Sequence, residues 1–95
     1  MKLTKINSHT VSLDLANQWD QEQALSLSQE ILAKLGQHQV IETIAGADRF
    51  DCRFRFAEQD FVLHFEHYSE SCWIEADDEF NELGIAPLLP VLIEH

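Results

Sequence analysis

The chain has 95 residues and a formal net charge of −11 at pH 7, and 45% of its residues are hydrophobic. This length leaves room for one domain over residues 1–95, and the composition is typical of folded proteins. The excess of acid repels phosphate backbones and anionic lipids, which argues against nucleic-acid binding and membrane binding.

Charge is distributed unevenly along the chain. Residues 1–56 contain all six Lys and Arg together with seven acidic residues, whereas residues 57–95 contain ten acidic residues and no Lys or Arg. An acidic surface of this kind can steer a basic protein partner, but a solvated face that keeps the protein soluble gives the same pattern.

The N-terminal residues are typical of a cytoplasmic protein. Lys2 and Lys5 are not followed by the apolar stretch of a signal peptide. The longest mostly apolar segment, residues 85–93, is too short to span a bilayer and contains Pro87 and Pro90. Two Cys in a chain without a leader are more typical of reduced thiols than of a disulfide.

An extended segment and a helix are predicted first along the chain. Val11, Leu13 and Leu15 alternate with polar residues within residues 3–15, which favours a half-buried strand with a tight turn or a bulge at residues 7–8. Asp20 and Gln23 then have the spacing of a capping box. Apolar residues recur at helical spacing up to a glycine at position 36, so we predict a helix over residues 20–35 that packs on a sheet.

A strand meander is predicted after this helix, because the apolar period changes from 3.6 to 2. Strands are expected over residues 40–45 and 49–56, and two more follow. A four-residue loop over residues 57–60 places Phe56 opposite Phe61 and Phe54 opposite Leu63. A similar loop over residues 68–71 adds the fourth strand of the meander.

The C-terminal part is expected to be helical. Acidic residues 77–79 precede Phe80 and Leu83, which favours a short helix that ends near Gly84. Residues 85–95 are apolar around two prolines that suit the first turn of another helix. This tail either packs on its own domain or forms a seam with a second chain. The predicted fold is therefore α+β, with two layers: an antiparallel sheet of about five strands, one main helix on one face and a short helical C-terminal tail.

Three residues on the apolar face suggest a metal site. The predicted register places Cys52 one row from the pair of His67 and Cys72, so two thiols and an imidazole converge. Zinc favours sulfur and nitrogen ligands. The close Cys-x-x-Cys spacing is missing, however, and a fourth ligand would have to come from His38 or an acid. Buried Cys is also a common small core residue, so the metal site is an alternative and no cofactor is expected otherwise.

The polar face of the sheet offers a histidine among charges. The predicted register sets Arg53, His64 and Glu75 in one row, and a histidine beside a carboxylate can act as a general base. No nucleophile adjoins it in the pattern, and cross-strand ion pairs give the same arrangement without chemistry. We therefore assign no catalytic residue and do not expect an enzyme.

Aromatic and acidic residues are the strongest candidates for a contact surface. Trp73 is predicted on the polar face in a row with Glu66 and Asp51, and an aromatic side chain among charges is typical of an interface anchor. The acidic run after it lacks the spacing and the glycine of a calcium-binding loop. The expected contact surface consists of Tyr68, Trp73, Glu75, Asp77, Asp78, Glu79 and Glu82.

Two segments carry a resemblance to a known family. The segment HYSESCWIE at residues 67–75 and the turn AGADR at residues 45–49 resemble a family of small bacterial proteins catalogued only as a domain of unknown function, and the likeness extends over nearly the whole chain. It implies a cytoplasmic bacterial protein without an assigned activity, and it carries over no functional residue.

These observations favour a non-enzymatic acidic protein that binds an unknown protein partner. A basic partner fits the charge, and a homodimer through the apolar tail is another form of the same hypothesis. Two alternatives stay open. One is a small metal-binding protein that uses Cys52, His67 and Cys72, and the other is an acidic inhibitor or immunity-like protein that blocks a basic partner.

Overall fold

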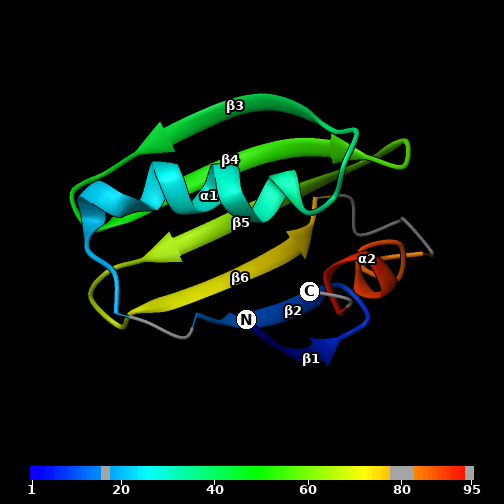
Figure 1. Ribbon diagram of the computed structural model, residues 1–95, viewed down its shortest axis with the longest axis horizontal. Coiled ribbons are helices and arrows are strands. Elements are labelled where there is room, and N and C mark those ends of the chain that lie inside the picture. The colour runs from blue at the N-terminus through cyan, green and yellow to red at the C-terminus, as the bar shows by residue number, and fades with distance from the viewer. Residues whose placement is uncertain (16–17, 78–82, 94–95) are drawn as a thin grey trace.

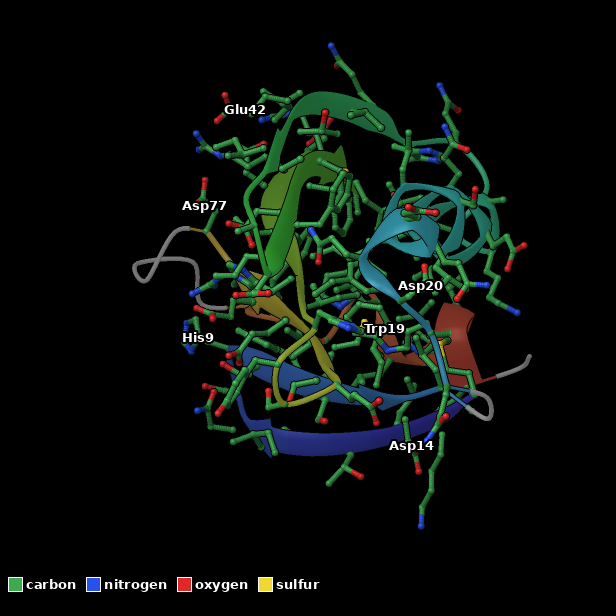
Figure 2. All side chains as sticks on the ribbon, turned by 90° about the vertical axis from the view of Figure 1, so that its left-hand side faces the viewer. His9, Asp14, Trp19, Asp20, Glu42 and Asp77 are labelled. Atoms are coloured by element: carbon green, nitrogen blue, oxygen red, sulfur yellow. The ribbon has the colours of Figure 1, made fainter. Side chains whose placement is uncertain are left out.

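A computed structural model describes residues 1–15, 18–77 and 83–93 and shows a six-stranded antiparallel sheet with both helices on one face (Figures 1 and 2). The sheet order is β1-β2-β6-β5-β4-β3, so β1 and β3 are the two edges. The strands are β1 Lys2–Asn7, β2 Thr10–Asp14, β3 Gln39–Ala45, β4 Arg49–Phe56, β5 Gln59–Glu66 and β6 Ser71–Ala76, and the helices are α1 Ala24–Ala33 and α2 Leu89–Ile93.

The sheet has one strand more than expected because the N-terminal segment folds back on itself. The chain reverses at Ser8 and His9, where the His9 backbone N–H donates to Asn7 Oδ1 at 2.8 Å. An Asn side chain that bonds the backbone two residues later stabilises such a turn. The segment predicted as one strand over residues 3–15 therefore corresponds to two strands, β1 and β2, over residues 2–14.

The predicted helix and its capping box are confirmed. Asp20 Oδ1 accepts from the Gln23 backbone N–H at 3.1 Å, and Gln23 Oε1 accepts from the Asp20 backbone N–H at 2.9 Å. A 3₁₀ turn over Gln21–Gln23 leads into α1. The Gln21 side-chain amide donates to the backbone oxygens of Gly46 and Arg49, and these bonds hold the start of the helix against the β3–β4 turn.

The core fills the space between the sheet and the two helices. Alternation along the strands turns one apolar face toward α1, which is the inner face of the sheet. Trp19 extends this core, because its ring meets Phe65 edge-on with 5.3 Å between centroids. The larger buried residues of the inner face are Val11, Leu13, Phe50, Phe54, Phe61, Leu63, Phe65 and Ile74, and they meet Ile31, Leu32 and Leu35 of the helical layer.

Pairing in the two central hairpins differs by two residues from the predicted register. Phe54 lies opposite Phe61, and Phe65 lies opposite Cys72. The β4–β5 connection is a two-residue turn rather than the expected four-residue loop, with φ of 53° at Ala57 and 64° at Glu58. Two-residue turns with positive φ at both positions normally contain Asn, Asp or Gly. The Ala-Glu pair therefore gives no sequence signal for this turn.

The shift changes the neighbours of each side chain but not its face, because a shift of two residues preserves the alternation. The predicted row of Arg53, His64 and Glu75 is wrong, since His64 lies between Asp51 and Trp73. Asp51 and Trp73 share a row as expected, but the residue between them is His64 and not Glu66.

The C-terminal tail packs on its own domain. Ile85, Leu88 and Leu92 are buried in the core, whereas Ile93 is exposed. The Ile85 backbone N–H donates to the Ser8 carbonyl at 3.0 Å, which ties the tail to the β1–β2 turn. Pro90 is the second residue of α2, where a helix needs no N–H donor. The short helix predicted before Gly84 falls mainly on residues 78–82, outside the described residues.

Candidate functional site

The outer face of the sheet, which points away from both helices, carries most of the polar groups predicted to be functional. Figure 2 shows Glu42 and Asp77 on this side and α1 on the other. Because Phe50, Cys52 and Phe54 of β4 point inward, the residues that alternate with them point outward. Outward positions of β5 and β6 complete the surface.

Four residues form an ordered group at the centre of the outer face, which we call the Trp73 cluster: Asp51, His64, Trp73 and Glu75. His64 Nδ1 lies 2.7 Å from Asp51 Oδ1, and His64 Nε2 lies 3.4 Å from Glu75 Oε1. The Trp73 indole Nε1–H donates to the same Glu75 oxygen at 2.7 Å. Each polar atom of the two rings therefore faces a carboxylate.

Ring stacking fixes the orientation of the Trp73 indole. The indole and the His64 imidazole are stacked with 4.9 Å between centroids and an interplanar angle of 21°. The Arg49 guanidinium lies 5.9 Å from the centroid of the same indole, within reach of a cation–π interaction. Trp73 is half-buried by these contacts. These contacts set the conformation of the Trp73 side chain.

The arginines of β4 are all paired with acids. Arg49 Nη2 lies 3.8 Å from Asp51 Oδ1, and Arg55 Nη1 lies 3.1 Å from Asp60 Oδ1. Arg53 donates hydrogen bonds to both Asp77 and Glu42. These bonds raise the pKa of the Arg53 guanidinium above its ordinary value, and the bond to Asp77 has the larger effect. The positive charges of β4 are thus already matched by carboxylates.

The Trp73 cluster contains a potential proton acceptor without an adjoining nucleophile among the described residues. Ser12 lies in the same row of the sheet, but its strand pairs with β6, so Trp73 stands between Ser12 and His64. A general base must reach the proton that it removes, at roughly 3 Å. Within the described part of the chain, the cluster thus presents an aromatic ring flanked by carboxylates, and no hydroxyl or thiol lies next to the imidazole in its row.

The predicted contact surface is assembled in part. Trp73 and Glu75 contact each other, and Asp77 binds Arg53 at the neighbouring row. Tyr68 lies in the β5–β6 turn with 88% of its surface exposed. Asp78, Glu79 and Glu82 lie outside the described residues. Sequence reasoning missed that His64 supports Trp73, because the β5–β6 turn covers residues 67–70 rather than 68–71, which places His64 instead of Glu66 opposite Trp73.

The alternative metal ligands are not brought together. Cys52 and Cys72 lie on β4 and β6 with β5 between them, and His67 packs against Trp19 with 5.6 Å between ring centroids. Burial raises the pKa of both thiols, that of Cys72 to about 12, so both are neutral core groups near pH 7. No cluster of three His, Cys, Asp or Glu residues in the described part of the chain is arranged to hold a metal ion.

Comparison with known proteins places the chain in a family. Within the described residues, no helix has the length and apolar character needed to cross a membrane. Searches of curated proteins and of solved structures gave no match. A family described as "Protein of unknown function (DUF3630)" matches residues 1–93. Because this match covers almost the whole chain, the protein belongs to the DUF3630 family.

Proposed function

We propose that this protein is a non-enzymatic, cytoplasmic interaction module that binds a basic surface of another protein through the outer face of its sheet. The observation that carries the proposal is the position of Trp73, held by a stacked histidine and by Glu75 at the centre of a face that carries no helix among the described residues. An aromatic anchor held in place before binding loses little conformational freedom in the complex.

The charges around Trp73 favour a cationic partner. Every arginine of β4 already has a carboxylate partner, as described above. An incoming anion would have to compete with those carboxylates, whereas an incoming Lys or Arg finds acids beside an indole ring. The net charge of −11 adds long-range attraction for a basic protein. An inhibitor that blocks a basic partner is one form of this function.

Selection from a displayed random peptide library on the wild-type protein tests the proposal. We expect the enriched peptides to carry Lys or Arg, and their binding to shift the NMR signal of the Trp73 indole N–H. Trp73→Ala should weaken binding at least about tenfold, as removal of an interface anchor does. Tyr68→Ala should weaken it less, because the exposed Tyr68 lies at the margin of the surface.

The control variant is Gln29→Ala, which changes an exposed residue of α1 on the other side of the sheet. Circular dichroism of each variant checks that the fold is retained. Enrichment of acidic peptides, or peptides bound equally well by wild type and Trp73→Ala, would show that the outer face is not the binding surface.

A further inference from the structure

The β3 edge, residues Gln39–Ala45, carries no Lys or Pro and, in the part of the chain that the structure describes, pairs with no strand on its outer side. β3 is the last strand of the sheet, and all seven of its residues are exposed. Soluble proteins block such edges with lysines, prolines or covering elements, because the unpaired backbone groups attract another strand. The opposite edge follows this rule, since β1 carries Lys2 and Lys5, whereas β3 contains no Lys, Arg or Pro.

Aliphatic side chains make this edge apolar. Val40, Ile41 and Ile44 are each about half exposed, at 46–53%. A bulge interrupts the pairing between Val40 and Glu42. From Glu42 to Ala45 the pairing with β4 is regular, so this stretch presents an ordered backbone for a further strand.

We call three exposed residues on the inner side of the sheet, Leu25 of α1 and Thr43 and Ala45 of β3, the shelf. Thr43 and Ala45 are paired with the buried Cys52 and Phe50, so they lie on the inner face. Leu25 follows Gln21 by one helical turn, on the side of α1 that is bonded to the β3–β4 turn, and is 48% exposed. Figure 1 shows α1 in front of the inner strands while β3 lies at the margin of the sheet. Apolar side chains of an added strand would cover this shelf.

Charge decides which kind of strand fits. Glu42 is the charged residue of β3, and its side chain is 47% exposed on the outer face. It shares the Arg53 guanidinium with Asp77, so two carboxylates are matched by one cation and the group as a whole stays negative. A second copy of the chain would bring the same acidic strand and a net charge of −11, so it offers Glu42 no cation from β3 and is repelled as a whole. A strand that places Lys or Arg opposite Glu42 is complementary instead.

We propose that the β3 edge binds an extended segment of a basic partner protein as a seventh strand. Side chains opposite Glu42 and Ile44 would lie on the outer face, where a cation meets Glu42, and those opposite Thr43 and Ala45 would be aliphatic and cover the shelf. Main-chain hydrogen bonds to the open edge supply affinity, and this alternation supplies specificity. The β3 edge is three strands away from Trp73, and this proposal does not depend on the Trp73 cluster.

The test uses a capped hexapeptide, Thr-Lys-Val-Lys-Val-Lys, whose lysines share one face when it is extended, and a second peptide with Glu in place of each Lys. Titration into the isotope-labelled full chain should show that the lysine peptide binds at least about tenfold more tightly than the glutamate peptide. Shifts should concentrate in residues 39–45, and the backbone amides there should exchange more slowly with solvent.

Charge reversal at the edge gives the decisive comparison. Glu42→Lys should abolish the preference for the lysine peptide or reverse it, whereas Glu30→Lys, the same charge change at an exposed position of α1, should leave the preference nearly unchanged. Trp73→Ala should also retain it, so this proposal and the proposed function can fail separately. Equal effects of the two reversals, shifts confined to the Trp73 cluster, or a dimer with β3 amides already protected without peptide would each overturn it.

Discussion

Gly84 is the position where one added methyl group should damage the fold most. Its φ of +53° lies in the left-handed region, and a Cβ atom there would overlap the Ser8 carbonyl oxygen and lie 3.0 Å from the carbonyl carbon. That oxygen accepts the hydrogen bond from the Ile85 N–H. Gly84→Ala therefore forces the tail and the β1–β2 turn apart at the point where they are joined.

The expected loss of stability has separable parts. The left-handed backbone costs an alanine about 1 kcal/mol. Loss of the bond to the Ile85 N–H leaves a buried donor unsatisfied, at about 1–3 kcal/mol. If Ile85 is also unseated from the core, a further contribution of about 1.5–3 kcal/mol follows. We expect a total of at least about 3 kcal/mol, a large fraction of the stability of a small domain.

Two other glycines are matched controls. Gly36 has φ +78° with no atom within 4 Å of an added Cβ, so Gly36→Ala should cost only the conformational term, about 1 kcal/mol. At Gly46 an added Cβ would lie 3.7 Å from the Arg49 carbonyl oxygen, which is an ordinary van der Waals contact. Gly46→Ala should therefore change the free energy of unfolding by less than about 0.5 kcal/mol. Urea unfolding, followed by tryptophan fluorescence and circular dichroism, measures all three. Equal losses at Gly84 and Gly36 would refute the steric reasoning.

Three further predictions concern the turn, the helix start and a buried thiol. Glu58→Gly removes the steric cost of a left-handed backbone in the β4–β5 turn. It should raise the free energy of unfolding by about 1 kcal/mol, seen as a higher urea midpoint. Asp20→Ala removes the acceptor of the capping box and should cost about 1 kcal/mol, whereas Asp20→Asn should cost less in the same assay. The Cys72 pKa of about 12 in the folded state exceeds the ordinary 9.0, so the folded state retains a proton that the unfolded chain loses. Stability should therefore fall as pH rises from about 9 to 12, by up to about 4 kcal/mol, and Cys72→Ala should flatten this fall; an unchanged slope would contradict the assignment.

Much of the fold follows from the sequence because alternation and capping are local signals. The charged residues between Phe50 and Phe56 assign both faces of β4 without reference to any other strand. Asp20 and Gln23 mark the helix start by their spacing alone. The number of strands was less accessible, because residues 7–8 suited a tight turn or a bulge within one strand, and only the turn, which the structure shows at Ser8 and His9, makes two strands.

Register was the part that local patterns could not determine. The Ala57-Glu58 turn adopts a backbone that its residues do not favour, so the surrounding sheet imposes it. The candidate site depends on this turn for the pair of Asp51 and His64, and on the β5–β6 turn for the pair of His64 and Trp73. Trp73 and Glu75 were identified from their residue types, whereas the support that His64 gives to Trp73 follows only from the observed pairing.

The sheet order also constrains how the chain can be completed during synthesis. The strands from β3 to β6 pair with sequence neighbours, but β2 pairs with β6, so that Val11 meets Ile74. The ribosome delivers β2 long before its partner, and the apolar side of the N-terminal hairpin stays unburied until most of the chain has emerged. Closure of this long loop carries an entropic cost that the meander avoids. We therefore expect the N-terminal hairpin to dock beside β6 after the meander has paired, together with the tail that is bonded to Ser8.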